Sequence, residues 1–93
     1  MVVYTFKSTA TEQQKAALID EMDRFPKLFP AMRNWTSGIN ISWRDRTFTH
    51  AFNVEFATES ELDAYLRSEH HERFVKEKFF PLVERRAVIS YAV

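Results

Sequence analysis

Apolar and polar residues alternate with the period of a β-strand in several stretches of the chain. The clearest is Phe48–Phe56, where every second residue from the first onward is a phenylalanine, a histidine or a valine. Weaker alternation predicts strands over Val2–Lys7 and over Ala87–Val93. A fourth strand is predicted over Arg33–Ser42, with a bulge at Gly38 because the alternation is kept only after that glycine.

Helical periodicity fills the segments between these strands. A Thr-x-x-Gln capping-box pattern at Thr11 precedes a helix predicted over Glu12–Leu28. The related pattern Thr-x-x-Glu begins a second helix at Thr58. Ser68 has the features of a further cap, so we expect a break there and a short helix over Glu69–Phe79.

The predicted elements follow the order β-α-β-β-α-β, which is the ferredoxin-like arrangement of the α+β class. Its strands form one antiparallel sheet with helices on a single face. A chain of 93 residues rarely holds two cores, so we expect one domain over residues 1–93. The open face of the sheet must meet water or a second copy, and we expect a homodimer through it.

Composition narrows the possible functions. Thirteen basic and thirteen acidic residues balance, so the chain has no long-range field for nucleic acid or an anionic membrane surface. There is no cysteine, no apolar run long enough to span a membrane and no signal-peptide pattern, and we therefore expect a cytoplasmic protein. Nine phenylalanines, three tyrosines and two tryptophans are many for this length, which suggests an aromatic-lined cavity or a covering partner.

Candidate chemistry gathers near the predicted break at Ser68. Residues 71, 74, 75, 78 and 79 share one face of the short helix, so His71 is expected to point inward while His70 is solvated. Tyr65 lies on the inward face of the preceding helix and can converge with His71 because the helix breaks between them. His50 is on the helix-side face of its strand and is expected to join them.

A neutral histidine at the start of a helix can act as a base, because the helix dipole disfavours the imidazolium. We therefore predict proton abstraction next to a carbonyl, with His71 as general base and Tyr65 as hydrogen-bond donor to the carbonyl or enolate oxygen. Each residue also has a structural interpretation. Tyr65 can be a packed ring with its hydroxyl at the rim, and His71 and His50 can be buried hydrogen-bonding groups.

The chain resembles the stress-responsive A/B barrel (Dabb) family over its whole length. The residues that carry the resemblance are Phe29–Met32, Gly38, Thr47–Phe56, Leu62–Leu66 and Ser68–Phe74. Members of this family are small ferredoxin-like chains that pair sheet to sheet into a dimeric α/β barrel. The resemblance therefore implies the same dimer, but it names no reaction, because most members have no established activity.

A plant polyketide cyclase of this family closes an aromatic ring without a cofactor. Its catalytic tyrosine and histidine match Tyr65 and His71, and a histidine also matches His50. The resemblance thus implies catalytic roles for Tyr65 and His71, no cofactor, and a small aromatic or polyketide-like ligand. Met22 replaces an aromatic residue of the cyclase, which leaves the substrate open. The candidate substrate-binding residues are His50, Phe52, Met22 and Phe74.

Other classes of function are weighed on the same residues. A metal site built from His50, His70 and His71 is disfavoured because adjacent histidines diverge on a helix. RNA recognition is rejected because the aromatic residues of the Phe48–Phe56 strand face the helices, not the open face. Two alternatives stay open: a cofactor-free monooxygenase, in which Trp35 or Trp43 faces the cavity, and a binding or structural module without turnover.

Overall fold

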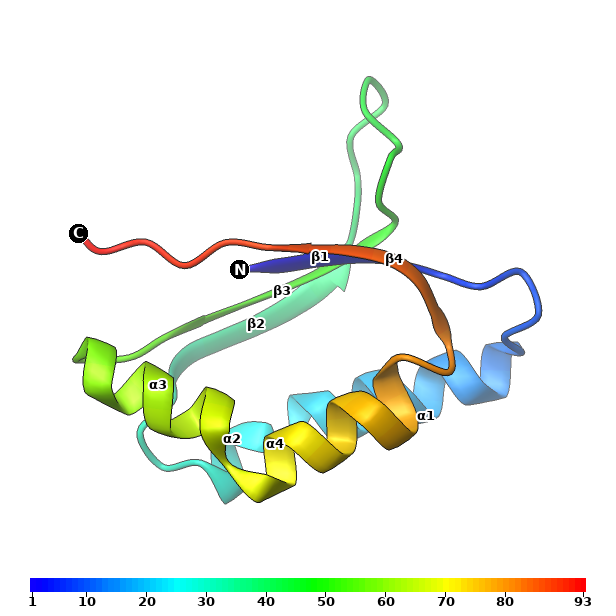
Figure 1. The fold of residues 1–93 in the computed structure, drawn as a ribbon. Helices are drawn as coiled ribbons and strands as arrows, with labels where there is room; N and C mark the ends of the chain where they lie inside the picture. The colour runs from blue at the N-terminus through cyan, green and yellow to red at the C-terminus, as the bar shows by residue number, and fades with distance from the viewer.

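The four strands of the protein form one antiparallel sheet in the order β2-β3-β1-β4. In the computed structural model, which describes residues 1–93, all the helices lie against one face of this sheet (Figure 1). The α+β, ferredoxin-like fold predicted from the sequence is confirmed. The elements are β1 Val2–Phe6, α1 Glu12–Asp23, α2 Phe25–Leu28, β2 Arg33–Ile39, β3 His50–Glu55, α3 Glu59–Arg67, α4 Glu69–Phe74, the π-helix η1 Val75–Phe79, and β4 Val83–Val88.

The strand register decides which residues face the helices. On the central strand β1, Tyr4 lies opposite His50 of β3 and Arg86 of β4, and Tyr4 is almost completely buried under the helices. Its neighbour Val3 lies opposite Ala51 and Ala87 and points to the other side, because successive side chains of a strand alternate. The helix-free face is thus small and apolar along its centre.

The core lies between the sheet and the helices, and six of its ten buried residues are tyrosines or phenylalanines. Phe25 of the short helix α2 packs edge-to-face on Phe74 of α4, with ring centroids 4.9 Å apart. Phe29, Phe52 and Phe56 are half-buried around this cluster. The buried set is Tyr4, Phe6, Leu18, Met22, Phe25, Met32, Tyr65, Phe74, Phe79 and Val83.

The first predicted helix is two helices. The capping box at its start forms as expected, since the Thr11 hydroxyl accepts from the amide of Gln14 and the Gln14 side chain accepts from the amide of Thr11. At the other end α1 stops at Asp23, and a separate helix begins at Phe25. Pro26 is the reason, because it has no amide proton to continue the hydrogen-bond ladder of α1.

The bulge predicted at Gly38 is wrong. Gly38 pairs regularly with Ala51, and the irregular pairing of β2 lies between Arg33 and Thr36. Asn34, inside that interval, has a φ of 54°, a left-handed conformation that asparagine tolerates better than most residues. Its side-chain amide donates to Glu55 of β3 at 3.0 Å, which holds the irregular end of β2 on the sheet.

The last strand is also displaced from its predicted position. β4 spans Val83–Val88, and only its end overlaps the predicted Ala87–Val93. Charged residues at positions 84 to 86 concealed it, yet charge is common on an edge strand that has one partner. Beyond β4, Ile89 still exchanges two hydrogen bonds with Met1, each 3.0 Å long.

A π-helical turn shapes the end of the second helical segment. The amide of Phe80 donates to the carbonyl of Val75 at 2.9 Å, and this longer turn brings both Phe74 and Phe79 to the buried side. Lys78, predicted on the inward face, instead points outward and pairs with Glu21 of α1 at 2.8 Å. In a regular α-helix, Phe74 and Phe79 would point about 140° apart around the axis, and the π-turn brings the two directions closer together.

Two further features complete the fold. β3 begins at His50, two residues later than predicted, and residues 40–49 form a loop that projects beyond the open face of the sheet (Figure 1). The side chain of Asn40 orders this loop by donating to the carbonyls of Asp45 and Phe48.

None of the helices has the length and apolar character needed to cross a membrane.

Candidate functional site

A cavity of about 1200 Å³ lies between the helix-side face of the sheet and the helices α3 and α4. Its walls are mostly apolar, and the candidate residues Met22, Phe52 and Phe74 are among them. Tyr65 and His71 line the same cavity. Five of the six residues singled out from the sequence are thus brought together around one space, which is the arrangement expected of a small-molecule site.

The break at Ser68 is what lets Tyr65 and His71 meet. Ser68 is extended, with φ −63° and ψ 145°, and it is both the C-cap of α3 and the N-cap of α4. Its hydroxyl donates to the carbonyl of Tyr65 at 2.8 Å and accepts from the amide of His71 at 3.2 Å. The two rings consequently lie with their centroids 4.6 Å apart, tilted by 60°.

His71 is held in one tautomer. Its Nδ1 lies 3.1 Å from the carbonyl oxygen of Leu66. A carbonyl can only accept, so Nδ1 carries the proton and Nε2 keeps a free lone pair. Burial lowers the pKa of His71 below its usual range, and this outweighs the opposing effects of the Leu66 hydrogen bond and of Glu72. The ring is therefore a neutral base near pH 7.

Tyr65 supplies a proton donor beside that base. Its side chain is buried against Phe29, Phe56 and His71, and burial raises the pKa of its hydroxyl, which stays protonated. The hydroxyl has no partner in the protein, yet no side-chain oxygen is sealed in the interior without one. Because Tyr65 lines the cavity, its hydroxyl is placed to donate to a molecule bound there.

His50 lies elsewhere. It is on the helix-side face, as predicted, but it packs in the core against Tyr4 at 5.5 Å and Phe6 at 5.0 Å and is not among the residues that line the cavity. Its Nδ1 is 2.7 Å from the hydroxyl of Thr49. Burial, followed by the charge of Lys15, lowers the pKa of His50. The structure does not bring it together with the Tyr65–His71 pair.

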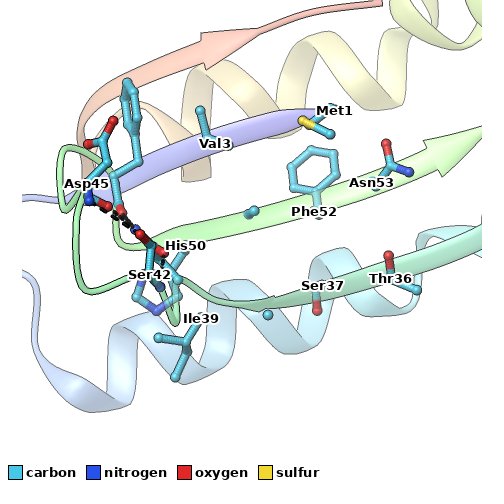
Figure 2. A pocket seen from close by; sticks show the side chains of 14 residues that line it. Met1, Val3, Thr36, Ser37, Ile39, Ser42, Asp45, His50, Phe52 and Asn53 are labelled. Atoms are coloured by element: carbon cyan, nitrogen blue, oxygen red, sulfur yellow. Dashed lines mark hydrogen bonds between the residues drawn. The ribbon is translucent and has the colours of Figure 1, made fainter.

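A second, shallower space borders His50. Figure 2 shows this groove of about 490 Å³, which runs along the sheet from the loop that bears Ser42 to Asn53. His50 and Ile39 stand at the loop end of the groove, on the side of α1. Met1, Phe52 and Asn53 line both this groove and the larger cavity, so the two spaces border the same part of the sheet.

The other candidate groups stay outside the cavity. Trp35 stacks on Phe52 with ring centroids 4.8 Å apart, and its indole N–H donates to Asp23 at 2.9 Å, so it is a structural ring. Trp43 is 84% exposed on the projecting loop. The structure contains no group of three or more histidine, aspartate or glutamate side chains arranged to hold a metal ion.

One lining residue escaped the sequence reasoning. Arg86 reaches the cavity from β4, on the same sheet face as Tyr4, its opposite residue on β1. Because the last strand was predicted to begin at Ala87, Arg86 lay outside it and was not assigned to either face of the sheet. Its signal was the alternation of Arg86 with Val88, which becomes readable once β4 is placed.

Solved structures of the same fold cover nearly the whole chain. A hydroxynitrile lyase from Passiflora edulis is 26% identical, with a TM-score of 0.90 over 99% of this chain and 88% of that one. A Dabb family protein with a ferredoxin-like fold from Mesorhizobium loti is 21% identical, with a TM-score of 0.86 over 99% and 91% of the two chains. A dimeric ferredoxin-like protein of unknown function from Thermobifida fusca is 17% identical, with a TM-score of 0.81 over 99% and 86%.

No curated protein matches the chain by sequence. The family model for the stress-responsive A/B barrel domain, Dabb, matches residues 1–93. This agrees with the resemblance carried by the segment from His50 to Phe74. The chain belongs to the stress-responsive A/B barrel family.

Proposed function

We propose that the protein binds a small apolar or aromatic compound in the cavity and performs cofactor-independent acid–base chemistry on a carbonyl group. One observation carries this proposal: the Leu66 carbonyl holds His71 with its Nε2 unprotonated, beside the unpartnered hydroxyl of Tyr65. In an enolate-forming step, a base and a proton donor that face one apolar space have separate tasks. The base takes up the proton, and the donor stabilises the negative charge that develops on the oxygen.

In the proposed step, Nε2 of His71 takes a proton from the carbon next to the carbonyl. The electron pair of that C–H bond forms the enolate, and the Tyr65 hydroxyl donates a hydrogen bond to the enolate oxygen. The step moves one proton and needs no oxidant or metal. Apolar walls that include Met22, Phe52 and Phe74 reduce contact with water and so strengthen both interactions.

A second reaction of the same base is supported by the likeness to the Passiflora edulis hydroxynitrile lyase, at 26% identity. Cleavage of a cyanohydrin begins with removal of the hydroxyl proton, here by His71. The carbon–carbon bond electrons then leave with cyanide, the carbonyl forms, and cyanide takes up a proton. Tyr65 can hold the developing carbonyl oxygen in both reactions.

The experiment measures both reactions with defined probes. Exchange of the α-protons of phenylacetone in D₂O, followed by proton NMR, reports enolate formation, and release of benzaldehyde from mandelonitrile reports cyanohydrin cleavage. We expect the wild type to accelerate at least one of them over buffer and His71→Gln to lose the acceleration. A wild type inactive on both probes, or a fully active His71→Gln, would contradict the proposal.

We also propose that the protein acts as a homodimer paired through the helix-free face of the sheet, as a dimeric α/β barrel. The centre of this face carries Val3 between Ala51 and Ala87, which is suited to close packing against a second copy. Sedimentation should show a dimer at micromolar concentration. Val3→Glu should give a monomer, whereas Ala64→Glu, which adds the same charge on the exposed side of α3, should leave the dimer intact.

A further inference from the structure

Arg86 is the one lysine or arginine side chain that lines the large cavity. Its guanidinium lies over the ring of Phe80, 4.9 Å from the ring centroid, which holds the long side chain in place. Arg86 makes no ion pair with any carboxylate of the protein, whereas its neighbour Arg85 on the opposite face lies 3.5 Å from Glu84. Arg86 is exposed, and the cavity therefore has at its edge a cation without an acidic partner.

The acidic residues of the cavity wall are on other elements. Glu55 ends β3, while Glu59 and Asp63 are on α3. Glu55 accepts from Asn34, and Asp63 pairs with Arg67 at 2.9 Å, so neither is directed at Arg86. The cavity wall therefore carries its acidic residues on β3 and α3 and its one basic residue on β4.

We infer that Arg86 is a specificity residue of this cavity, and that the preferred ligand is an elongated apolar or aromatic compound with a carboxylate at the end that lies toward β4. This inference rests on the proposed function and names its substrate class. A single guanidinium suits a single negative charge, and its planar fork matches the two oxygens of a carboxylate.

The helix that carries His71 sets the length of such a ligand. His71, Val75 and Phe79 all line the cavity, so one of its walls runs along the helix from His71 to Phe79. The next residue is Phe80, and the guanidinium of Arg86 lies over its ring. The eight steps from His71 to Phe79 would span roughly 12 Å at the rise of an α-helix, and less here because Val75–Phe79 is a π-helix. We therefore expect about 10 Å between the reacting carbon and the carboxylate, with the apolar walls covering the part between them.

The test compares two probes that differ in one group, ω-phenylhexanoate and its neutral amide, ω-phenylhexanamide. Binding is measured by NMR titration of the wild type, Arg86→Gln and Arg85→Gln at low salt. In the wild type the acid should bind about three- to tenfold more tightly than the amide, the range expected for a partly exposed charged pair. Added salt should reduce that preference.

Arg86→Gln should bind acid and amide equally, with the affinity for the amide unchanged. Arg85→Gln is the matched control, since it removes the same charge from the same strand on the open face and should keep the preference. Binding of both probes without a preference, or a preference that survives Arg86→Gln, would overturn the inference and leave the proposed cavity standing. Failure of both probes to bind would overturn the inference and ligand binding in the cavity together, while the phenylacetone assay tests the base separately.

Discussion

The layer between sheet and helices contains a tyrosine–histidine pair at each of two places, and the pairs are built differently. At the first, here called the filled end, Tyr4 and His50 stack in the core with Phe6. At the second, the open end, Tyr65 and His71 face the cavity. Burial raises the pKa of both tyrosines, that of Tyr4 to about 12, and lowers the pKa of both histidines.

The directions of these pKa shifts are therefore the same for the two pairs, whereas their hydrogen bonding and their access to a cavity differ. The Nδ1 of His71 faces a carbonyl, which fixes the proton on that nitrogen and leaves a lone pair on Nε2. The Nδ1 of His50 faces the Thr49 hydroxyl, which can donate or accept and so leaves the tautomer free. Only the first arrangement holds a lone pair in place beside a cavity.

Exchanging each histidine for glutamine gives the largest expected effect. His71→Gln should slow the exchange of phenylacetone by about 10²–10⁴-fold, the usual contribution of a general base. His50→Gln should leave the rate near that of the wild type, because His50 does not line the cavity. Circular dichroism of both variants checks that the fold is kept. Equal losses in the two variants would remove the distinction between the ends.

Truncating a ring at each end tests the free energy of unfolding instead of the exchange rate. Here the larger effect is expected at the filled end. Tyr4 is 1% exposed among Phe6, Phe52 and Phe79, so Tyr4→Ala should lower the free energy of unfolding by about 3–5 kcal/mol. Phe56 is half-buried at the cavity, and Phe56→Ala should cost about 1–2 kcal/mol. Urea unfolding measures both. A larger loss for Phe56→Ala would mean that the open end is the better packed one.

Removing one hydroxyl at each end is a finer comparison. Tyr65→Phe should reduce the exchange rate by about 10²-fold, as expected when a donor to an oxyanion is lost. Tyr4→Phe should leave the rate unchanged, because that hydroxyl is not at the cavity. Neither change should alter the free energy of unfolding by more than about 1 kcal/mol, since neither hydroxyl bonds to the protein. A stability loss without a rate loss in Tyr65→Phe would favour the packed-ring interpretation.

For each candidate residue, the sequence predicts the face of the helix or strand well. It predicts the position of that residue relative to neighbouring elements less well. Alternation placed His50 on the helix side of the sheet, and its pairing with Tyr4 confirms that face. The position along the strand depends on the pairing register and on the ten-residue loop before it, residues 40–49, and neither is encoded in a local pattern. The expected meeting of His50 with Tyr65 failed for that reason.

Local signals succeeded where the backbone alone decides. The caps at Thr11 and Ser68 formed as predicted, because each satisfies amides within a few residues. The π-turn that turns Lys78 outward and the edge strand that carries Arg86 were missed, since both depend on packing against distant elements. The lining of the cavity could thus be predicted around Ser68 but not at β4.

The pH dependence of folding stability is the smallest expected effect, and it compares the two ends through the titration of their histidines. Both histidines have a pKa below their unfolded value of 6.5, so the unfolded chain binds more protons once the pH falls below about 6.5. Folding stability should be complete above that pH and decline as the pH falls through the lowered values. His50→Gln and His71→Gln should each weaken this decline, as measured by urea unfolding across the range.

Catalysis should follow only one of the two groups. The exchange rate of the wild type should persist below pH 6.5 and fall when the depressed pKa of His71 is reached, because the imidazolium has no lone pair. His50→Gln should alter the stability profile and leave the rate profile in place. A rate profile that moves with His50→Gln would couple the two ends, and His50 would then have to act on the site through Tyr4 or Phe52, the rings between them.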